Sequence, residues 1–383
     1  AWDEIEALEQ RGQLYGDDSA WRNWQPEPTG FKALCLNVAH NCNLACRYCF
    51  ATTDEDLMPL EVAIKAVDWL VANSQDRKVL EVDFFGGEPL LNWPVVQGVV
   101  EYAQGIKDKT FNFTLTTNGV LLTPDKMAYL NEANIGVVLS IDGRREIHDR
   151  MRPPAHGRYS SYERILPAFL EMARSRNHEN YYVRGTFTSA NLDFTEDVAH
   201  LADLGFQQIS LEPVVLKDVP YALTEEHLPQ ICREYERLTE LLLAYEQEGR
   251  TVDFFHFKVD LFTGPCLPKR LTSCGAGFEY LAVTPGGDFY PCHQFIGREG
   301  FRLGNVADGR LNETLVEEFR QAHLFNKESC PSCWARYYCG GGCHANAHLF
   351  NGDIHKPYQL GCDLHKKRLE CSLYLQSRRH GAE

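Results

Sequence analysis

The sequence predicts an α/β protein whose first large part is a partial TIM-like barrel of six strand–helix units, a (β/α)6 arrangement. From about residue 31 to about residue 215, short runs of β-branched and aromatic residues alternate with longer amphipathic runs. Strands that are separated by helices pair in parallel, because each helix carries the chain back to the same end of the sheet. A doubly wound open sheet would show the same alternation, so this pattern alone does not choose between the two.

The positions of the expected elements follow from this alternation. We expect strands over residues 33–39, 79–85, 111–117, 136–141, 181–188 and 208–213. The helices expected between them span residues 61–73, 94–105, 124–132, 161–175 and 195–203. A long amphipathic helix is expected over residues 224–248, and a closing helix over residues 360–378.

Composition divides the chain into three expected regions. Residues 1–30 are polar and predict an N-terminal helix and linker, and residues 31–250 hold the barrel. Residues 251–383 are rich in cysteine and glycine, and Gly286-Gly287 predicts a hairpin there. A region with so thin a hydrophobic core typically depends on bound metal for its stability.

The overall composition favours a cytoplasmic protein that binds metal through cysteine. The chain has 14 cysteines among 383 residues and no recognisable export signal, and disulfides are disfavoured in the cytosol. A net charge of −15 without a stripe of Lys and Arg makes a nucleic-acid partner unexpected. No apolar run approaches the ~20 residues of a membrane span, so no membrane partner is expected either.

The first cysteine group, Cys42, Cys46 and Cys49, has the spacing C-x3-C-x2-C and directly follows the first expected strand. It is therefore expected at the carboxyl ends of the barrel strands, where barrel enzymes place their active sites. Three thiolates can hold three corners of a cubane iron–sulfur cluster and leave the fourth iron open to a small molecule, whereas ordinary clusters have four cysteines. The alternative is a zinc site short of one ligand, but structural zinc sites normally have four.

This motif, with an aromatic residue before its third cysteine, resembles the signature of the radical S-adenosylmethionine (SAM) superfamily. Gly86-Gly87-Glu88-Pro89 resembles the GGEP motif of that superfamily, whose backbone and acid receive the SAM amino group. The resemblance implies that the three cysteines are the catalytic ligands of a cluster that cleaves SAM to a 5′-deoxyadenosyl radical. It also implies SAM contacts at other strand ends and beside the cysteines, namely by Tyr48, Asn118, Ser140, Asp142 and Arg184. The plain alternatives are turn glycines, a core aromatic and, for Arg184, a surface ion pair.

A second cysteine region combines a C-x12-G-x4-C pair with a later C-x2-C-x5-C-x3-C group and one further cysteine. This pattern resembles the SPASM domain, which holds two auxiliary iron–sulfur clusters; a pair of zinc sites is the alternative. The resemblance implies an outer cluster fully ligated by Cys330, Cys333, Cys339 and Cys362, and an inner cluster held by Cys274, Cys292 and Cys343. The expected cofactors are therefore three 4Fe-4S clusters and SAM.

The inner cluster is expected to lack a fourth protein ligand. Sulfatase-modifying relatives carry a further cysteine where this chain has Tyr280, although Cys266 could fill the gap from upstream. An open iron favours a bound thiolate, which a substrate carbon radical could attack to form a sulfur-to-carbon thioether. His293 stands where those relatives have an Asp, and it could take the thiol proton or serve in packing.

Longer segments, among them residues 84–92 (FFGGEPLLN) and 290–295 (YPCHQF), resemble the SCIFF peptide maturases, which form thioethers. The resemblance implies a Cys-rich precursor peptide, cross-linked from Cys sulfur to a neighbouring Thr, with a flavodoxin- or ferredoxin-type reductant in an anaerobic organism. Such enzymes begin with a peptide-recognition domain, which would precede residue 1 here. Two alternatives are formylglycine formation of the sulfatase-maturase kind, against which Tyr280 and His293 count, and a non-catalytic electron-transfer protein, against which the GGEP motif counts.

Overall fold

The computed structural model describes residues 2–12, 24–27, 29–51, 54–217, 219–259 and 267–380. These residues form one ten-stranded sheet with the strand order β10-β9-β8-β1-β2-β3-β4-β5-β6-β7. The six expected strands are confirmed to within one residue at each end: β1 (Ala33–Ala39), β2 (Val79–Gly86), β3 (Thr110–Thr117), β4 (Gly136–Ser140), β5 (Tyr181–Phe187) and β6 (Gln208–Pro213). They pair in parallel in sequence order, which confirms the partial barrel.

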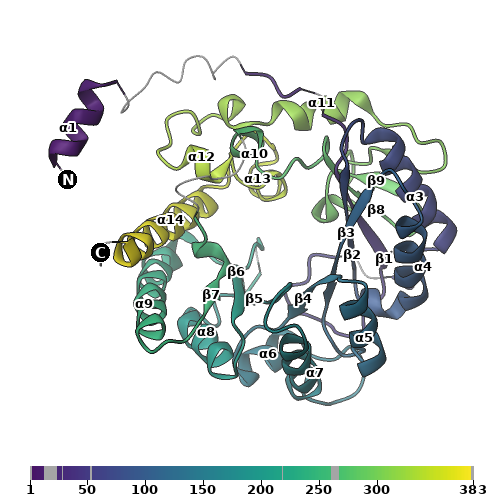
Figure 1. Ribbon diagram of the computed structural model, residues 1–383, viewed down its shortest axis with the longest axis horizontal. Helices are drawn as coiled ribbons and strands as arrows, with labels where there is room; N and C mark the ends of the chain where they lie inside the picture. The colour runs from purple at the N-terminus through teal and green to yellow at the C-terminus, as the bar shows by residue number, and fades with distance from the viewer. Residues whose placement is uncertain are drawn as a thin grey trace.

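Helices cover the outer side of this sheet in chain order, and Figure 1 shows them as an arc around the strands. They are α3 (Leu60–Asn73), α4 (Trp93–Gln104), α5 (Pro124–Glu132), α6 (Arg145–Met151), α7 (Ser161–Ser175), α8 (Phe194–Asp203) and α9 (Leu228–Gln247). The helix α6 was not expected from the sequence. The expected helix over 224–248 begins four residues later, because a 3-10 turn (Glu225–His227) precedes α9.

Four short strands extend the barrel sheet at its two edges. β7 (Asp253–Phe254) pairs in parallel with β6, and β8 (Tyr280–Val283) pairs in parallel with β1. β9 (Asp288–Tyr290) and β10 (Gly304–Asn305) then continue in antiparallel fashion. The expected hairpin is confirmed, and Gly287 takes the left-handed backbone conformation (φ +84°) that its turn requires. The cysteine-rich region thus shares its sheet with the barrel, and the expected division at residue 250 stays a prediction.

The remaining helices are α1 (Trp2–Gln10), α10 (Leu267–Thr272), α11 (Glu313–Gln321), α12 (Arg336–Cys339), α13 (His344–Asn351) and α14 (Gln359–His380). In Figure 1, α14 runs beside α9, and α10 lies next to α12. The closing helix α14 reaches the barrel edge, where the Ser372 hydroxyl donates a buried hydrogen bond to the Phe257 carbonyl oxygen (2.6 Å). Every helix that the structure describes is too short or too polar to span a bilayer.

Trp69 of α3 joins the barrel to the cysteine-rich region. Its ring packs against Phe289 of β9, with 4.6 Å between ring centroids, and its indole nitrogen donates to the Gly309 carbonyl oxygen (2.8 Å). Phe31 packs on the other side of the same indole at 4.8 Å. A buried aromatic contact of this kind holds the two regions at a fixed separation, which matters for sites that lie on both.

The two faces of the barrel strands differ in chemistry because alternate side chains point to opposite faces. On β2, Leu80, Val82 and Phe84 are completely buried in the hydrophobic core. Asp83, between them on the other face, accepts a hydrogen bond from the Thr114 hydroxyl of the neighbouring strand β3. The strands therefore present polar groups on the face opposite the hydrophobic core.

The aromatic core between β5 and α8 offers a test of this packing. Phe187 is fully buried and stacks on Phe194 with 4.3 Å between centroids. Replacing Phe187 with Ala should destabilise the protein by about 3–5 kcal/mol, because it removes buried aromatic surface and leaves a cavity. Thermal unfolding followed by circular dichroism should show a melting temperature several degrees lower. The half-exposed Tyr374 provides the control, since Tyr374→Ala should change it little; equal effects of the two changes would contradict the packing described.

Candidate active site

The loop that carries Cys42, Cys46 and Cys49 follows β1 and is held by the segment after α6. The backbone nitrogen of Ala45 donates to the Pro153 carbonyl oxygen (2.8 Å), and that of Arg47 donates to the Met151 carbonyl oxygen (2.9 Å). The backbone nitrogen of Cys49 donates to the Cys46 carbonyl oxygen (3.1 Å), which closes a turn. Chain segments a hundred residues apart thus fix the backbone from which the three thiols project.

The glycines of the GGEP motif let β2 approach this loop closely. The Gly87 nitrogen donates to the Ala39 carbonyl oxygen (2.7 Å), and the next nitrogen donates to the Asn41 carbonyl oxygen (3.0 Å). A Cβ atom on Gly86 would lie 2.1 Å from the Ala39 oxygen, and one on Gly87 would lie 2.3 Å from the Asn41 oxygen. Gly86 also has φ +131°, which side chains rarely allow. Both positions therefore require glycine.

Burial makes Cys42 and Cys46 poor thiolates unless a cation is present. It raises the pKa of Cys42 to about 11 and that of Cys46 to about 12. The neighbouring cysteines add to both shifts, which shows that the three sulfurs converge. A bound metal centre supplies the positive charge that deprotonates such ligands, so the site suits metal ligation through sulfur.

The spacing of the sulfurs argues against zinc. Among the described residues, the single group of three or more ligand atoms within 4.8 Å of one another comes from His40, Asp54 and Asp56, and contains no cysteine. Tetrahedral zinc with thiolates at about 2.3 Å needs sulfur atoms roughly 3.8 Å apart. The wider spread of the cysteines fits the larger cubane, whose irons are bridged by sulfide.

A buried hydrogen-bond network around Asp142 holds Tyr48 of the cysteine loop. Asp142, at 0% exposure, accepts from the Tyr48 hydroxyl (2.6 Å), from Arg152 Nε (3.1 Å) and from the Thr186 backbone nitrogen (2.9 Å). The Arg152 guanidinium also lies 5.4 Å from the centre of the Tyr48 ring. With its carboxylate so engaged, Asp142 positions Tyr48, which lies between Cys46 and Cys49 in the sequence. The predicted contact of Asp142 with SAM stays a prediction.

Glu88 is equally enclosed. Its carboxylate accepts hydrogen bonds from the Thr117 hydroxyl (2.7 Å) and from the backbone nitrogens of Leu90 (3.0 Å) and Asn118 (2.7 Å). Burial raises the pKa of Glu88 to about 7 against the opposing effect of these donors. The carboxylate therefore ties the end of β2 to the end of β3. The expectation that it receives the SAM amino group stays a prediction, and Gly86 and Gly87 line a cavity.

Four other predicted SAM contacts lie at or near strand ends. Pro89 begins the buried 3-10 turn Pro89–Asn92 after β2. The Asn118 amide donates to Asn43 Oδ1 (2.7 Å) and lies 3.6 Å from the Cys42 sulfur, so it touches the cysteine loop. Ser140 ends β4 beside Arg184 of β5, which is half-exposed and 3.5 Å from Glu212. Their contacts with SAM, like that of Tyr48, stay predictions.

The four cysteines predicted for the outer cluster line one cavity. It has a volume of about 280 Å³ and is bounded by Cys330, Cys333, Cys339 and Cys362, together with His365 and Lys366. Burial raises the pKa values of Cys330 and Cys362 to about 11. The structure therefore brings together cysteines from a loop, from α12 and from α14 around a space that could hold a cluster.

The three cysteines predicted for the inner cluster also converge. Burial raises the pKa of Cys292 well above its usual value, and the charges of Cys343 and Cys274 are the next largest causes. Backbone nitrogens of the following residues donate to the sulfurs of Cys292 and Cys343, which precede a 3-10 turn (His293–Phe295) and α13. Such donors favour a thiolate. Cys266 lies outside the described residues, so its role as a fourth ligand stays a prediction.

Tyr280 lies where a further cysteine would stand in the sulfatase-modifying relatives. Burial raises its pKa well above the usual value, and the sulfurs of Cys35 and Cys292 also contribute. The phenol therefore lies close to the inner cysteine set. It hydrogen-bonds to Cys35 of β1, which ties this corner of the set to the barrel.

His293 connects the inner cysteine set to the SAM side of the barrel. Its ring lies 4.7 Å from Phe85, just before Gly86, and 5.6 Å from Phe50, just after Cys49. It lines a cavity of about 150 Å³ together with Gly86 and Gly87. Burial lowers the pKa of His293 to about 4, so the ring is neutral. Its role as a proton acceptor stays a prediction.

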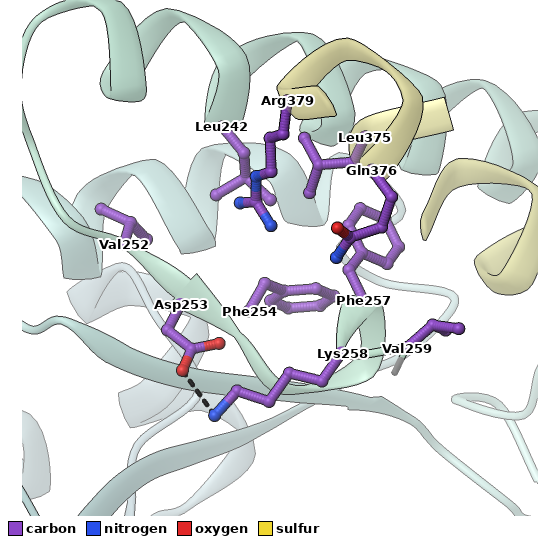
Figure 2. Close-up of a pocket in the computed structure, with 10 residues that line it drawn as sticks. All are labelled: Leu242, Val252, Asp253, Phe254, Phe257, Lys258, Val259, Leu375, Gln376 and Arg379. Atoms are coloured by element: carbon purple, nitrogen blue, oxygen red, sulfur yellow. Dashed lines mark ion pairs between the residues drawn. The ribbon is translucent and has the colours of Figure 1, made fainter. Parts of the chain in front are cut away.

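A third cavity lies apart from all of these residues. Figure 2 shows it between α9, α14 and the strand β7, with Phe254 and Phe257 on its floor and the ion pair of Asp253 and Lys258 (2.5 Å) at its side. Its volume is about 410 Å³. No cysteine or histidine lines it among the described residues, so it lacks the ligands expected of an iron–sulfur cluster.

Sequence reasoning missed two buried cations near the sites, Arg152 and Lys327. Arg152 stands after an unexpected helix, and no motif marks it. Lys327 precedes Cys330 by three residues, and this nearness to a predicted cluster ligand was the one feature of the sequence that could have indicated a cation at the site. Both are more than nine-tenths buried, which the local sequence does not reveal.

The barrel, the three-cysteine loop and the cysteine-rich extension together define an iron–sulfur protein of the SAM-cleaving class. The radical SAM superfamily profile matches residues 36–188, and that of the SPASM iron–sulfur cluster-binding domain matches residues 274–334. An uncharacterized protein of Methanocaldococcus jannaschii is 30% identical over 282 residues, which are 73% of this chain and 90% of that protein. The chain therefore belongs to the radical SAM superfamily and carries a SPASM domain.

Two further proteins show the range of this similarity. The radical SAM cyclopropyl synthase TigE of Paramaledivibacter caminithermalis is 25% identical over 362 residues, which are 88% of this chain and 72% of TigE. The solved structure of native anSMEcpe with bound AdoMet and Cp18Cys peptide has a TM-score of 0.75 at 20% identity, covering 92% of this chain and 99% of that one. The similarity to the anSMEcpe structure concerns the fold alone.

The close approach at Gly87 gives a direct test of the first cysteine site. Gly87→Ala should displace the cysteine loop, because the new Cβ would overlap the Asn41 oxygen. Iron and sulfide analysis should then find about four fewer irons per chain than in the parent, and 5′-deoxyadenosine formation from SAM should stop. Gly286→Ala is the matched control, since its nearest neighbour would be 4.0 Å away. Normal iron content and SAM cleavage in Gly87→Ala would refute this account of the motif.

Proposed function

We propose that this chain is a radical SAM peptide maturase that joins a Cys sulfur to a carbon, most simply of a neighbouring Thr, within a Cys-rich precursor peptide. The observation that carries the proposal is that the inner cysteine set lies close to the SAM motif of the barrel. His293 follows Cys292 of the inner set and packs on Phe85, beside the SAM motif. A substrate thiol at the inner set would therefore lie near the place where the substrate carbon is activated.

The proposed cofactors are three 4Fe-4S clusters and SAM. When bound, they supply a 5′-deoxyadenosyl radical that removes a hydrogen atom from carbon, and an acceptor for the electron left over when sulfur and carbon join. The substrate thus loses one hydrogen atom to deoxyadenosine and one thiol proton to a base or to water. A flavodoxin- or ferredoxin-type protein is the proposed source of the electron that SAM cleavage consumes.

The chain's own residues orient these groups and exclude water. Tyr48, held by Asp142, keeps an aromatic ring beside Cys46 and Cys49, while Gly86 and Gly87 give the cavity its open backbone. Tyr280 occupies the position of the extra cysteine, which leaves the inner set with three described sulfur ligands. This last feature favours thiol binding over a saturated electron carrier.

The bound peptide in the anSMEcpe structure supports a peptide substrate, because this chain covers almost the whole of that fold. Formylglycine formation is the competing peptide reaction. It would oxidise a Cys with loss of its sulfur, whereas thioether formation keeps the sulfur and removes two hydrogens. The products therefore separate the two functions cleanly.

The decisive experiment is anaerobic incubation with SAM, reductant and a synthetic peptide in which several cysteines each have a neighbouring threonine. After reduction and alkylation, the product should lack two hydrogens per link and should carry one fewer alkyl group for each link. Deuterium placed on Thr should appear in 5′-deoxyadenosine. The variant Cys46→Ala should form neither product. Deoxyadenosine formation without any cross-link, or loss of sulfur from the peptide, would overturn the proposal.

The outer cysteine set should be needed for cross-linking but not for SAM cleavage. Cys339→Ala removes one wall of the 280 Å³ cavity, so we expect deoxyadenosine to form while cross-linked peptide falls at least tenfold, a loss of about 1.4 kcal/mol in transition-state stabilisation. Mass spectrometry and deoxyadenosine quantification measure the two in one assay. Cys232→Ala, on the outer helix α9, is the control and should behave as the parent does. Full cross-linking in Cys339→Ala would show that the outer set is dispensable.

A further inference from the structure

Lys327 is the one lysine among the described residues that is buried, with 1% of its surface exposed. It stands directly after the 3-10 turn Leu324–Asn326, three residues before Cys330. An ammonium group rarely loses its water shell without an anion beside it, because the cost of desolvating a full charge is large. A bound anionic group beside Lys327 would offset this cost.

The hydrogen-bond partners of Lys327 are neutral. Its Nζ donates to the Gly341 carbonyl oxygen (2.7 Å) and lies 3.4 Å from His344 Nδ1. No carboxylate forms an ion pair with it within the part of the chain that the structure describes. Gly341, in the left-handed conformation (φ +98°), lets the loop between Cys339 and Cys343 lie against the lysine stem, since a Cβ atom there would be only 3.2 Å from the lysine Cδ.

The groups near Lys327 that would carry negative charge as cluster ligands are cysteines of both auxiliary sets. Cys330 and Cys339 belong to the outer set, and Cys274 and Cys343 belong to the inner set. Burial lowers the pKa of Lys327, and negative charge on these four sulfurs opposes that shift and favours the ammonium. The lysine thus lies between the two sets, and its carbonyl partner belongs to the short loop that connects them.

We propose that Lys327 is a shared counter-cation for the two auxiliary clusters, and that it raises the reduction potential of both. One-electron reduction adds a negative charge to a cluster, and a fixed buried cation stabilises that charge more in a low-dielectric interior than it would in water. Lys327 is a positioning residue in this sense, since it acts through the clusters and touches no substrate. Higher potentials would make the clusters better acceptors for the electron released on thioether formation. The inference rests on the auxiliary clusters of the proposed function.

The test is a redox titration of the reconstituted full chain, followed by EPR spectroscopy under anaerobic conditions. Replacing Cys42, Cys46 and Cys49 with Ala in every sample leaves the auxiliary signals free of overlap. Lys327→Met removes the charge but keeps the length of the side chain, and Lys327→Arg keeps the charge. Lys356→Met is the matched control, because Lys356 lines none of the cavities described above, is exposed and pairs with Asp353 (3.9 Å).

We expect Lys327→Met to lower both auxiliary potentials by at least a tenfold change in the one-electron reduction equilibrium, which is about 59 mV. Lys327→Arg and Lys356→Met should stay close to the parent. Unchanged potentials in Lys327→Met with full auxiliary iron would overturn the inference. Lys327→Met could also fail to hold auxiliary iron. In that case, normal auxiliary iron in Lys327→Arg supports the need for a positive charge. Loss of auxiliary iron in both variants shows a packing role and overturns the inference. A parent that lacks auxiliary iron would contradict the proposed function itself.

Discussion

The close approach of the end of β2 to the loop after β1 is the constraint on which the rest of the site depends. Two carbonyl oxygens of that loop accept backbone hydrogen bonds from the GGEP segment, and neither Gly86 nor Gly87 leaves room for a Cβ. The carboxylate of Glu88 then ties the same segment to the end of β3. The ends of β1, β2 and β3 are thereby held together around the cysteine loop. The cavity of about 150 Å³ forms where the backbone of Gly86 and Gly87 remains exposed.

Burial of the thiols sets the chemistry of all three cysteine groups. Desolvation raises the pKa values of Cys46, Cys292 and Cys330, one in each group, so that their thiolates need a nearby cation. Backbone nitrogens at the starts of a 3-10 turn and of α13 donate to the sulfurs of Cys292 and Cys343, which favours their thiolates. The proposed counter-cation Lys327 lies near both auxiliary sets. Electrostatic support of this kind costs no reorganisation when charge changes during a reaction.

The shared sheet sets the distance between the SAM side and the auxiliary side. β8 pairs directly with β1, so the turn that presents Cys292 follows the same sheet as the loop that presents Cys42. Trp69 and its aromatic neighbours fix the outer side of this junction. A flexible linker between two separate domains would not hold His293 against Phe85, because each ordered contact would then have to offset the entropy of the linker.

The sequence by itself determined the six barrel strands and the position of each cysteine group, because periodicity and ligand spacing are local properties. It did not determine that the Asp142 carboxylate serves Tyr48 and Arg152, or that Glu88 is enclosed. It gave no sign that the barrel sheet continues into the cysteine-rich region. Those features depend on which distant segments pack together and on how much water that packing removes, and only the tertiary structure decides both.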